Sequence, residues 1–117
     1  MMKKVFVCYQ HEDKVTEEKE TLAICKYIRA QGCLPIAPKI YLPRFLTDEE
    51  SDRGFGRTAK LSLLYACEEL WYTGDTITRE MIEEICLAME KKKTVQYIPR
   101  HHIEKYYKTE VKNEENS

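Results

Sequence analysis

Four short apolar runs, separated by segments with helical periodicity, constrain the fold of this chain more than any other feature. The runs are Lys4–Cys8, Cys33–Ala37, Glu69–Thr73 and Thr94–Ile98. Short runs of this kind, bounded by turn residues, are typical of strands. Strands that alternate with helices predict an α/β fold, in which helices cover both faces of a parallel sheet. We therefore expect a three-layer sandwich around a parallel sheet of four to five strands, with Lys4–Cys8 central and Cys33–Ala37 beside it.

Capping residues mark the ends of the predicted helices. Asp13 can cap a helix that begins at Lys14, and Gly32 is suited to end it. Thr47 and Glu50 have the spacing of a capping box, in which the threonine hydroxyl and the glutamate side chain each serve the other residue's backbone amide. This pattern predicts a second long helix that ends near residue 67.

The last part of the chain contains a third clear helical pattern. Four apolar residues recur at positions i, i+3, i+4 and i+7, which predicts that they form a buried stripe: Ile82, Ile85, Cys86 and Met89. A short helix is expected over His101–Tyr107. The aromatic-rich segment Pro38–Phe45 is expected to be an irregular loop.

The composition points to one small globular domain. The chain has 117 residues, and we assign residues 1–108 to the domain and residues 109–117 to a polar tail. The net charge of −1 gives no electrostatic reason to expect a nucleic acid polymer or an anionic membrane as a partner. The apolar runs are too short to span a membrane. The start of the chain does not resemble a signal peptide, so a cytoplasmic location is expected.

The five cysteines are scattered along the chain without CxxC spacing. This distribution argues against a zinc site and against a disulfide framework. We therefore expect no metal and no cofactor, and we interpret the cysteines as small apolar residues in a reducing environment.

The parallel topology brings polar loops to one edge of the sheet. Right-handed crossovers place the loops that follow the strands at the same edge, where open α/β folds bind ligands. Three of these loops carry reactive side chains: Tyr9–Asp13, Pro38–Phe45 and Gly74–Thr78. Tyr9 and His11 could hold a ligand there, although a packed or solvent-exposed role is the more common one for such residues.

Glu84 is the strongest candidate for a chemical role. It could simply be a helix glutamate exposed to water, but Met81 and Ala88 lie one turn away on either side and make its surroundings apolar. Arg79 can pair with Glu83, which would leave Glu84 and Glu80 as an uncompensated pair of like charges. A carboxylate in such surroundings could act as a nucleophile toward a sugar carbon.

Three further residues could contact a substrate. Asp75 and Thr78 follow the third strand and could bind a ligand or serve as turn and cap residues. Arg57, one helical turn after Arg53, could face a phosphate or carboxylate. Pairing with nearby acidic side chains of the same helix is the alternative for both arginines.

Several segments together resemble the nucleoside 2-deoxyribosyltransferase-like superfamily, and in particular its small phage and bacterial branch. In chain order they are KVFVC, QGCLPIAPKIYLPRFL, CEELWYTGD and TREMIEEICLAMEKKKTV. The resemblance implies a flavodoxin-like, Rossmann-like sheet. It also implies cleavage of an N-glycosidic bond through a covalent sugar–glutamate intermediate. Glu84 falls at the position of the catalytic glutamate, and Tyr9 corresponds best to the family tyrosine at the end of the first strand.

The chain departs from the family pattern near the catalytic position. Thr78 stands where the transferases have an aspartate, and Glu80 stands where they have a glycine. The resemblance also implies a nucleoside or nucleotide as small-molecule partner and a homo-oligomer whose subunits complete each other's sites. Four aromatic residues could lie at such an interface or in the core: Tyr41, Phe45, Trp71 and Tyr72.

Two other functions compete with the glycosidase or transferase. A non-catalytic nucleotide-binding module is the first, because Glu80 in place of glycine adds bulk and charge beside the site. A phosphoacceptor receiver domain is the second, because Glu12 and Asp13 follow the first strand. It is disfavoured because Asp75 lies beyond Gly74 rather than at the end of the third strand.

Overall fold

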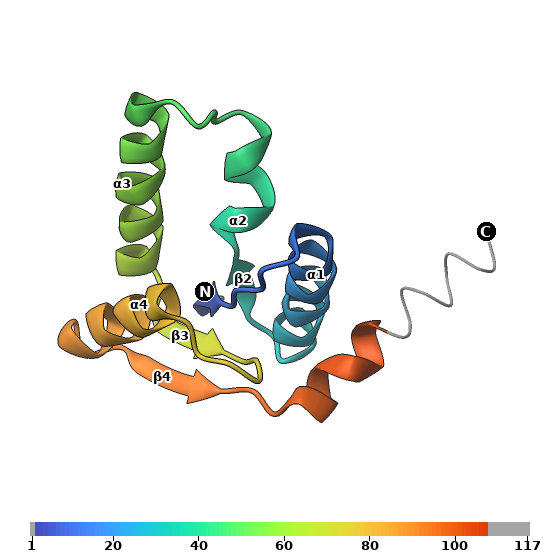
Figure 1. Ribbon diagram of the computed structural model, residues 1–117. Helices are drawn as coiled ribbons and strands as arrows, with labels where there is room; N and C mark the ends of the chain where they lie inside the picture. The colour runs from blue at the N-terminus through green and yellow to red at the C-terminus, as the bar shows by residue number, and fades with distance from the viewer. Residues whose placement is uncertain (1, 108–117) are drawn as a thin grey trace.

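A computed structural model describes residues 2–107 of the chain. Its centre is a sheet of four parallel strands: β1 (Lys4–Cys8), β2 (Leu34–Ile36), β3 (Glu69–Tyr72) and β4 (Thr94–Tyr97). The strand order is β2-β1-β3-β4, so β1 is an interior strand with β2 beside it at the edge (Figure 1). The predicted parallel sheet and the predicted place of β1 are therefore confirmed.

Helices occupy the segments between the strands. They are α1 (Lys14–Ala30), the short α2 (Pro38–Tyr41), the 3₁₀ turn η1 (Leu42–Arg44), α3 (Glu50–Ala66) and α4 (Arg79–Glu90). A further helix covers residues 100–107. The predicted polar tail, residues 109–117, lies outside the described residues.

The side chains of β1 alternate between two separate cores, as the period of a strand requires. Val5, Val7 and Tyr9 pack on one face with Ile24 and Ile28 of α1, and residues of the helix 100–107 join them. Phe6 and Cys8 pack on the other face with side chains of α3 and α4. Helices therefore cover both faces, which confirms the three-layer sandwich.

Both predicted ends of α1 are confirmed. The Asp13 carboxylate accepts a hydrogen bond from the backbone N–H of Thr16 at 3.3 Å. Gly32 follows the helix with φ of 81°, a conformation in which a side chain would be strained.

The predicted capping box at Thr47 is wrong. Glu49 is the N-cap of α3 and makes no side-chain capping bond. The Asp52 carboxylate instead accepts hydrogen bonds from the backbone N–H and the hydroxyl of Thr47, at 2.7 and 2.8 Å. A carboxylate in the first turn also suits the positive end of the helix dipole.

The predicted buried stripe of α4 is also wrong, because the buried face is rotated around the helix. Ile82 is 49% exposed and Met89 is 62% exposed. The buried residues of α4 are Met81, Glu84 and Ala88. The sequence pattern favoured the apolar stripe, but the structure buries the stripe that contains the glutamate. This rotation carries Glu84 into the interior.

Residues 38–44 are helical where an irregular loop was expected over Pro38–Phe45. Pro38 begins α2, because a proline suits the first turn of a helix. The long helix α3 buries Leu64 near its end and no other residue along its length. Together α2, η1 and α3 form an arch that stands away from the sheet (Figure 1). No helix within residues 2–107 has the length and the apolar character needed to cross a membrane.

The helix 100–107 is tied to α1 by an ion pair. Arg100 lies 2.6 Å from Glu20 of α1, and the side chain of Glu20 is 11% exposed. Burial raises the pKa of Glu20, but the hydrogen bonds from Arg100 and Tyr9 outweigh burial, and the net pKa is below its ordinary value. The pair therefore stabilises the fold when Glu20 is ionised.

The rotation of α4 can be tested with two adjacent residues. Ala88→Gln should lower the free energy of unfolding by about 2–3 kcal/mol, because a fully buried position must accept a larger polar side chain. Met89→Gln should change it by less than about 0.5 kcal/mol, because that side chain faces solvent. Urea unfolding measures both values. The opposite ranking would show that the stripe predicted from the sequence is the buried one.

The Arg100–Glu20 pair predicts a pH-dependent contribution to stability. Arg100→Met should lower the free energy of unfolding at neutral pH by about 1–2 kcal/mol. This is less than the cost of breaking a fully buried ion pair, because Arg100 is partly exposed to solvent. A carboxylate with a lowered pKa stabilises the fold above its unfolded value of 4.5 and loses this effect as the pH falls. The difference between wild type and variant should therefore shrink in acid. Arg29→Met, at an exposed position of α1, is the control. A difference independent of pH would contradict the assignment.

Candidate functional site

The candidate site lies where the chain leaves two neighbouring strands toward opposite faces of the sheet. β1 leads to α1 on one face, and its neighbour β3 leads to α4 on the other. The loops that follow these strands separate at their carboxyl ends, which is where open α/β sheets bind ligands.

Two cavities meet at this point. The smaller, of about 370 Å³, is lined by four residues singled out in the sequence, Tyr9, His11, Asp75 and Thr78. The larger, of about 720 Å³, lies between α1 and α2, and Glu80 lines it. Gln10 lines both cavities and separates them.

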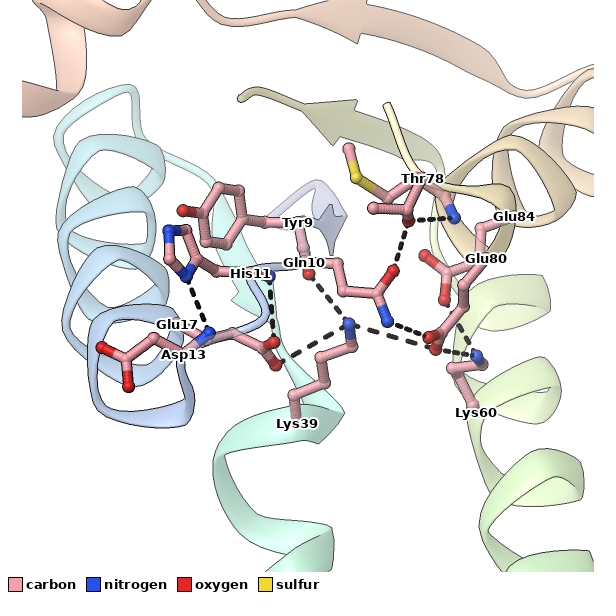
Figure 2. A network of polar contacts seen from close by, with 11 residues as sticks. Tyr9, Gln10, His11, Asp13, Glu17, Lys39, Lys60, Thr78, Glu80 and Glu84 are labelled. Carbon is pink, nitrogen blue, oxygen red and sulfur yellow. Dashed lines mark hydrogen bonds and ion pairs between the residues drawn. The ribbon is translucent and has the colours of Figure 1, made fainter. Parts of the chain in front are cut away.

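Gln10 links the loop after β1 to the start of α4. Its side-chain carbonyl accepts a hydrogen bond from the Thr78 hydroxyl, and its amide donates to Glu80 at 2.6 Å (Figure 2). Thr78 is also the N-cap of α4, since its hydroxyl accepts from the backbone N–H of Met81 at 3.2 Å. The cap and the ligand-binding roles considered for Thr78 are thus compatible.

Lys39, from α2, lies between two carboxylates. Its ammonium donates to the backbone carbonyl of Tyr9 at 2.9 Å, and lies 3.8 Å from Glu17 and 3.9 Å from Glu80 (Figure 2). Glu17 in turn accepts a hydrogen bond from the backbone N–H of His11 at 3.0 Å. Lys39 therefore joins α2 to both α1 and α4 at the edge of the larger cavity.

Lys60, from α3, bridges Glu80 and Glu84 of α4. Its ammonium lies 2.8 Å from Glu80 and 3.0 Å from Glu84. Burial lowers the pKa of Lys60, but the hydrogen bonds and charges of both glutamates outweigh burial and raise it above 10.5. Burial raises the pKa of Glu80, but Lys60 and Lys39 outweigh burial and lower it. The expectation that these two glutamates are uncompensated is therefore wrong, whereas the pairing of Arg79 with Glu83, at 3.6 Å, is confirmed.

Glu84 is almost completely buried, at 4% exposed. It packs on the face of the sheet that carries Cys8, and burial together with the Glu84 charge raises the pKa of the Cys8 thiol. Glu84 lines neither of the two cavities, whereas Glu80, one helical turn earlier, lines the larger one. Lys60, which contacts both Glu80 and Glu84, also lines neither of the two cavities.

Tyr9 and Glu84, the two residues with predicted catalytic roles, point to opposite faces of the sheet (Figure 2). The Tyr9 hydroxyl donates a hydrogen bond to Glu20. Burial, followed by the interaction with Glu20, raises the pKa of Tyr9. Gly74 has φ of 125°, and a Cβ there would lie 3.5 Å from the Tyr9 ring. The structure therefore places Tyr9 beside Asp75 and Thr78, without contact to Glu84.

Arg57 lies apart from the other residues singled out. It is exposed on α3 and lines neither of the two cavities. Asp75 is exposed in the loop after β3, at the mouth of the smaller cavity.

The cations that pair with the acidic side chains of the site were not predicted from the sequence. Lys39 follows β2 and Arg100 follows β4, so their positions after strands could have drawn attention to them. Lys60 gives no such signal, because it lies in the middle of α3. Within residues 2–107, no group of three or more histidine, cysteine or acidic side chains is arranged to hold a metal ion.

Comparison with known proteins supports a distant relationship in fold. A solved structure of a 2-deoxyribosyltransferase from the psychrotolerant bacterium Bacillus psychrosaccharolyticus is similar, with a TM-score of 0.68. The match covers 80% of this chain and 70% of that one, at 15% sequence identity. At this identity the similarity shows a shared fold. A search of curated proteins by sequence finds no match.

A comparison with protein families gives a match over most of the domain. The match covers residues 3–98, which include all four strands and α4 with Glu80 and Glu84. The chain therefore belongs to the family described as Domain of unknown function (DUF7768).

Proposed function

We propose that this protein cleaves or exchanges the N-glycosidic bond of a nucleoside or nucleotide, with Glu84 as the nucleophile. The observation that carries the proposal is a buried glutamate, paired with a lysine, on the helix that follows β3. It lies one helical turn after Glu80, which lines a cavity of about 720 Å³. The fold shared with a 2-deoxyribosyltransferase supports the same reaction class.

The proposed chemistry has two steps. A Glu84 oxygen attacks C1′ of the sugar, and the bond between C1′ and the base nitrogen breaks. The base leaves with the bonding electrons and gains a proton from solvent. Water then attacks the sugar ester to release the sugar, or a second base takes the sugar in an exchange.

The larger cavity offers suitable partners for a sugar. The Thr21 hydroxyl is buried and makes no hydrogen bond to the described residues, and Thr21 lines this cavity. Gln10 and Glu80 add an amide and a carboxylate. Hydroxyl, amide and carboxylate groups match the hydrogen-bonding needs of sugar hydroxyls.

The smaller cavity would hold another part of the ligand. Tyr9, His11, Asp75 and Thr78 line it on the far side of Gln10. In this proposal they position the substrate. A catalytic role for Tyr9 would require its hydroxyl to leave Glu20.

A non-catalytic nucleotide-binding module is the second candidate. It is favoured by the position of Glu80, which lines the larger cavity where Glu84 does not. In this alternative the cavities bind a nucleotide and Glu84 has a structural role in the ion-pair network.

Assembly into a homo-oligomer is part of the proposal. Trp71 is 6% exposed and belongs to the core, but Tyr41 and Phe45 are 45% and 58% exposed near the arch formed by α2, η1 and α3. Phe55 of α3 is a third exposed ring, at 56%. Exposed aromatic side chains of this kind are enriched at interfaces. Sedimentation at micromolar concentration should show a species larger than the monomer, and a monomer would count against assembly.

The catalytic proposal predicts that Glu84→Gln abolishes reaction with nucleosides. Glutamine keeps the shape of the side chain but cannot form the sugar ester. The free energy of unfolding should fall by about 1 kcal/mol, because Lys60 loses one of its two partners. Mass spectrometry of the protein incubated with 2′-deoxynucleosides and their monophosphates should detect a sugar adduct on Glu84.

Glu83→Gln provides the matched control for this experiment. Glu83 is the preceding residue, and its side chain is 66% exposed and paired with Arg79. This variant should form the adduct as wild type does. Binding of one of these compounds without any adduct or turnover would favour the binding module over the enzyme.

A further inference from the structure

The ammonium of Lys60, in α3, contacts two carboxylates that differ in their exposure to solvent. The Glu84 side chain is 5% exposed and the Glu80 side chain is 35% exposed, and both contact the ammonium of Lys60. The two glutamates lie at i and i+4 on α4, a spacing at which two negative charges destabilise a helix. Lys60 offsets this repulsion.

Removing Lys60 would leave Glu84 buried without a counter-charge. Within residues 2–107, the carboxylate of Glu84 forms an ion pair with the ammonium of Lys60. A buried carboxylate without a partner favours its neutral, protonated form. A protonated carboxylic acid is a poor nucleophile, so the charge of Lys60 bears directly on whether Glu84 can attack a sugar.

Glu80 is placed so that it could keep Lys60 paired during the same reaction. When Glu84 bonds to a sugar carbon, its negative charge is consumed by the ester. Lys60 would then be a half-buried cation without that partner. Because Glu80 already lies 2.8 Å from the ammonium, Lys60 remains paired after the charge on Glu84 is lost.

We propose that Lys60 is the positioning residue of the site, which keeps Glu84 ionised before attack and stays paired with Glu80 when Glu84 is esterified. This inference rests on the proposed function, since it concerns the same nucleophile. It assigns to Glu80 the role of a reserve counter-ion. Lys60 itself forms no bond to the substrate.

The first test needs no enzymatic activity. Lysine labelled with ¹³C at Cε allows the Lys60 amine to be titrated by NMR, and its signal is identified by its loss in Lys60→Arg. In wild type the pKa of Lys60 should lie above that of an ordinary lysine. Glu84→Gln and Glu80→Gln should each lower it, because each variant removes one negative neighbour. If Glu84→Gln leaves this pKa unchanged, the two residues are not paired in solution and the proposal is overturned.

The second test follows the rate of adduct formation against pH. Lys60→Met should slow the reaction about tenfold at mildly acidic pH, equivalent to about 1.4 kcal/mol. The loss should be smaller at mildly alkaline pH, because a higher pH opposes protonation of a buried carboxylate that lacks a partner. Lys60→Arg should restore most of the rate, because it keeps a positive charge. Lys19→Met, at an exposed position of α1, should match wild type.

The two tests separate the possible failures. If Lys60→Met has the wild-type rate at every pH, or slows the reaction equally at every pH without rescue by arginine, Lys60 is not the positioning residue. If wild type itself forms no adduct, the proposed function fails, and the NMR titration still decides whether Lys60 pairs with Glu84. If Lys60→Met does not fold, the titration and the activity of Lys60→Arg remain decisive: an arginine variant that folds but is inactive would overturn the proposal.

Discussion

The alternation of β1 between two cores is the constraint on which the rest of the structure depends. Every side chain from Val5 to Tyr9 is buried, and successive residues face opposite sides of the sheet. Cys8 therefore faces α4 and Glu84, whereas Tyr9 faces α1 and Glu20. The end of one strand thus supports two polar networks. Gln10, the next residue, lies between them and bonds to Thr78 and Glu80.

The two lysines that pair with Glu80 come from the arch and not from the sheet. Lys39 belongs to α2 and Lys60 to α3, and both contact Glu80 on α4. The arch has little buried apolar surface of its own, since α3 buries only Leu64 among its residues. Segments with few buried contacts open at lower free energy than the core. The ion pairs of Glu80 therefore depend on helices that bury few side chains of their own.

The strands of the sheet could be predicted from the sequence because each strand is specified by residues that are close together along the chain. Each strand is a short apolar run between turn residues, and the order of strands and helices implies parallel pairing. The run Cys33–Ala37 was expected beside Lys4–Cys8, and the structure pairs β2 with β1. Asp13 and Gly32 marked the ends of α1 because capping depends on neighbouring residues alone.

The prediction of the site was less complete because its charges depend on contacts between distant residues. The expected stripe of α4 was apolar, yet tertiary packing buried Met81, Glu84 and Ala88 instead. Lys60 and Glu84 are 24 positions apart in the sequence, yet their side chains form an ion pair. Nothing in the sequence of α3 indicated this contact. The loops after β1 and β3 did bring four of the residues singled out to one cavity. The position of the residues along the strands was thus predictable, whereas the pairing of their charges was not.

The burial of Glu84 and its pairing with Lys60 have opposite effects on its chemistry. Burial removes water and strengthens every electrostatic interaction at the carboxylate, but it also favours the protonated form. A nearby cation opposes protonation. In the proposed reaction Lys60 would keep a partner after the charge on Glu84 is consumed, because the same ammonium also contacts Glu80. Glu80 would thus belong to the same charge arrangement as the proposed nucleophile.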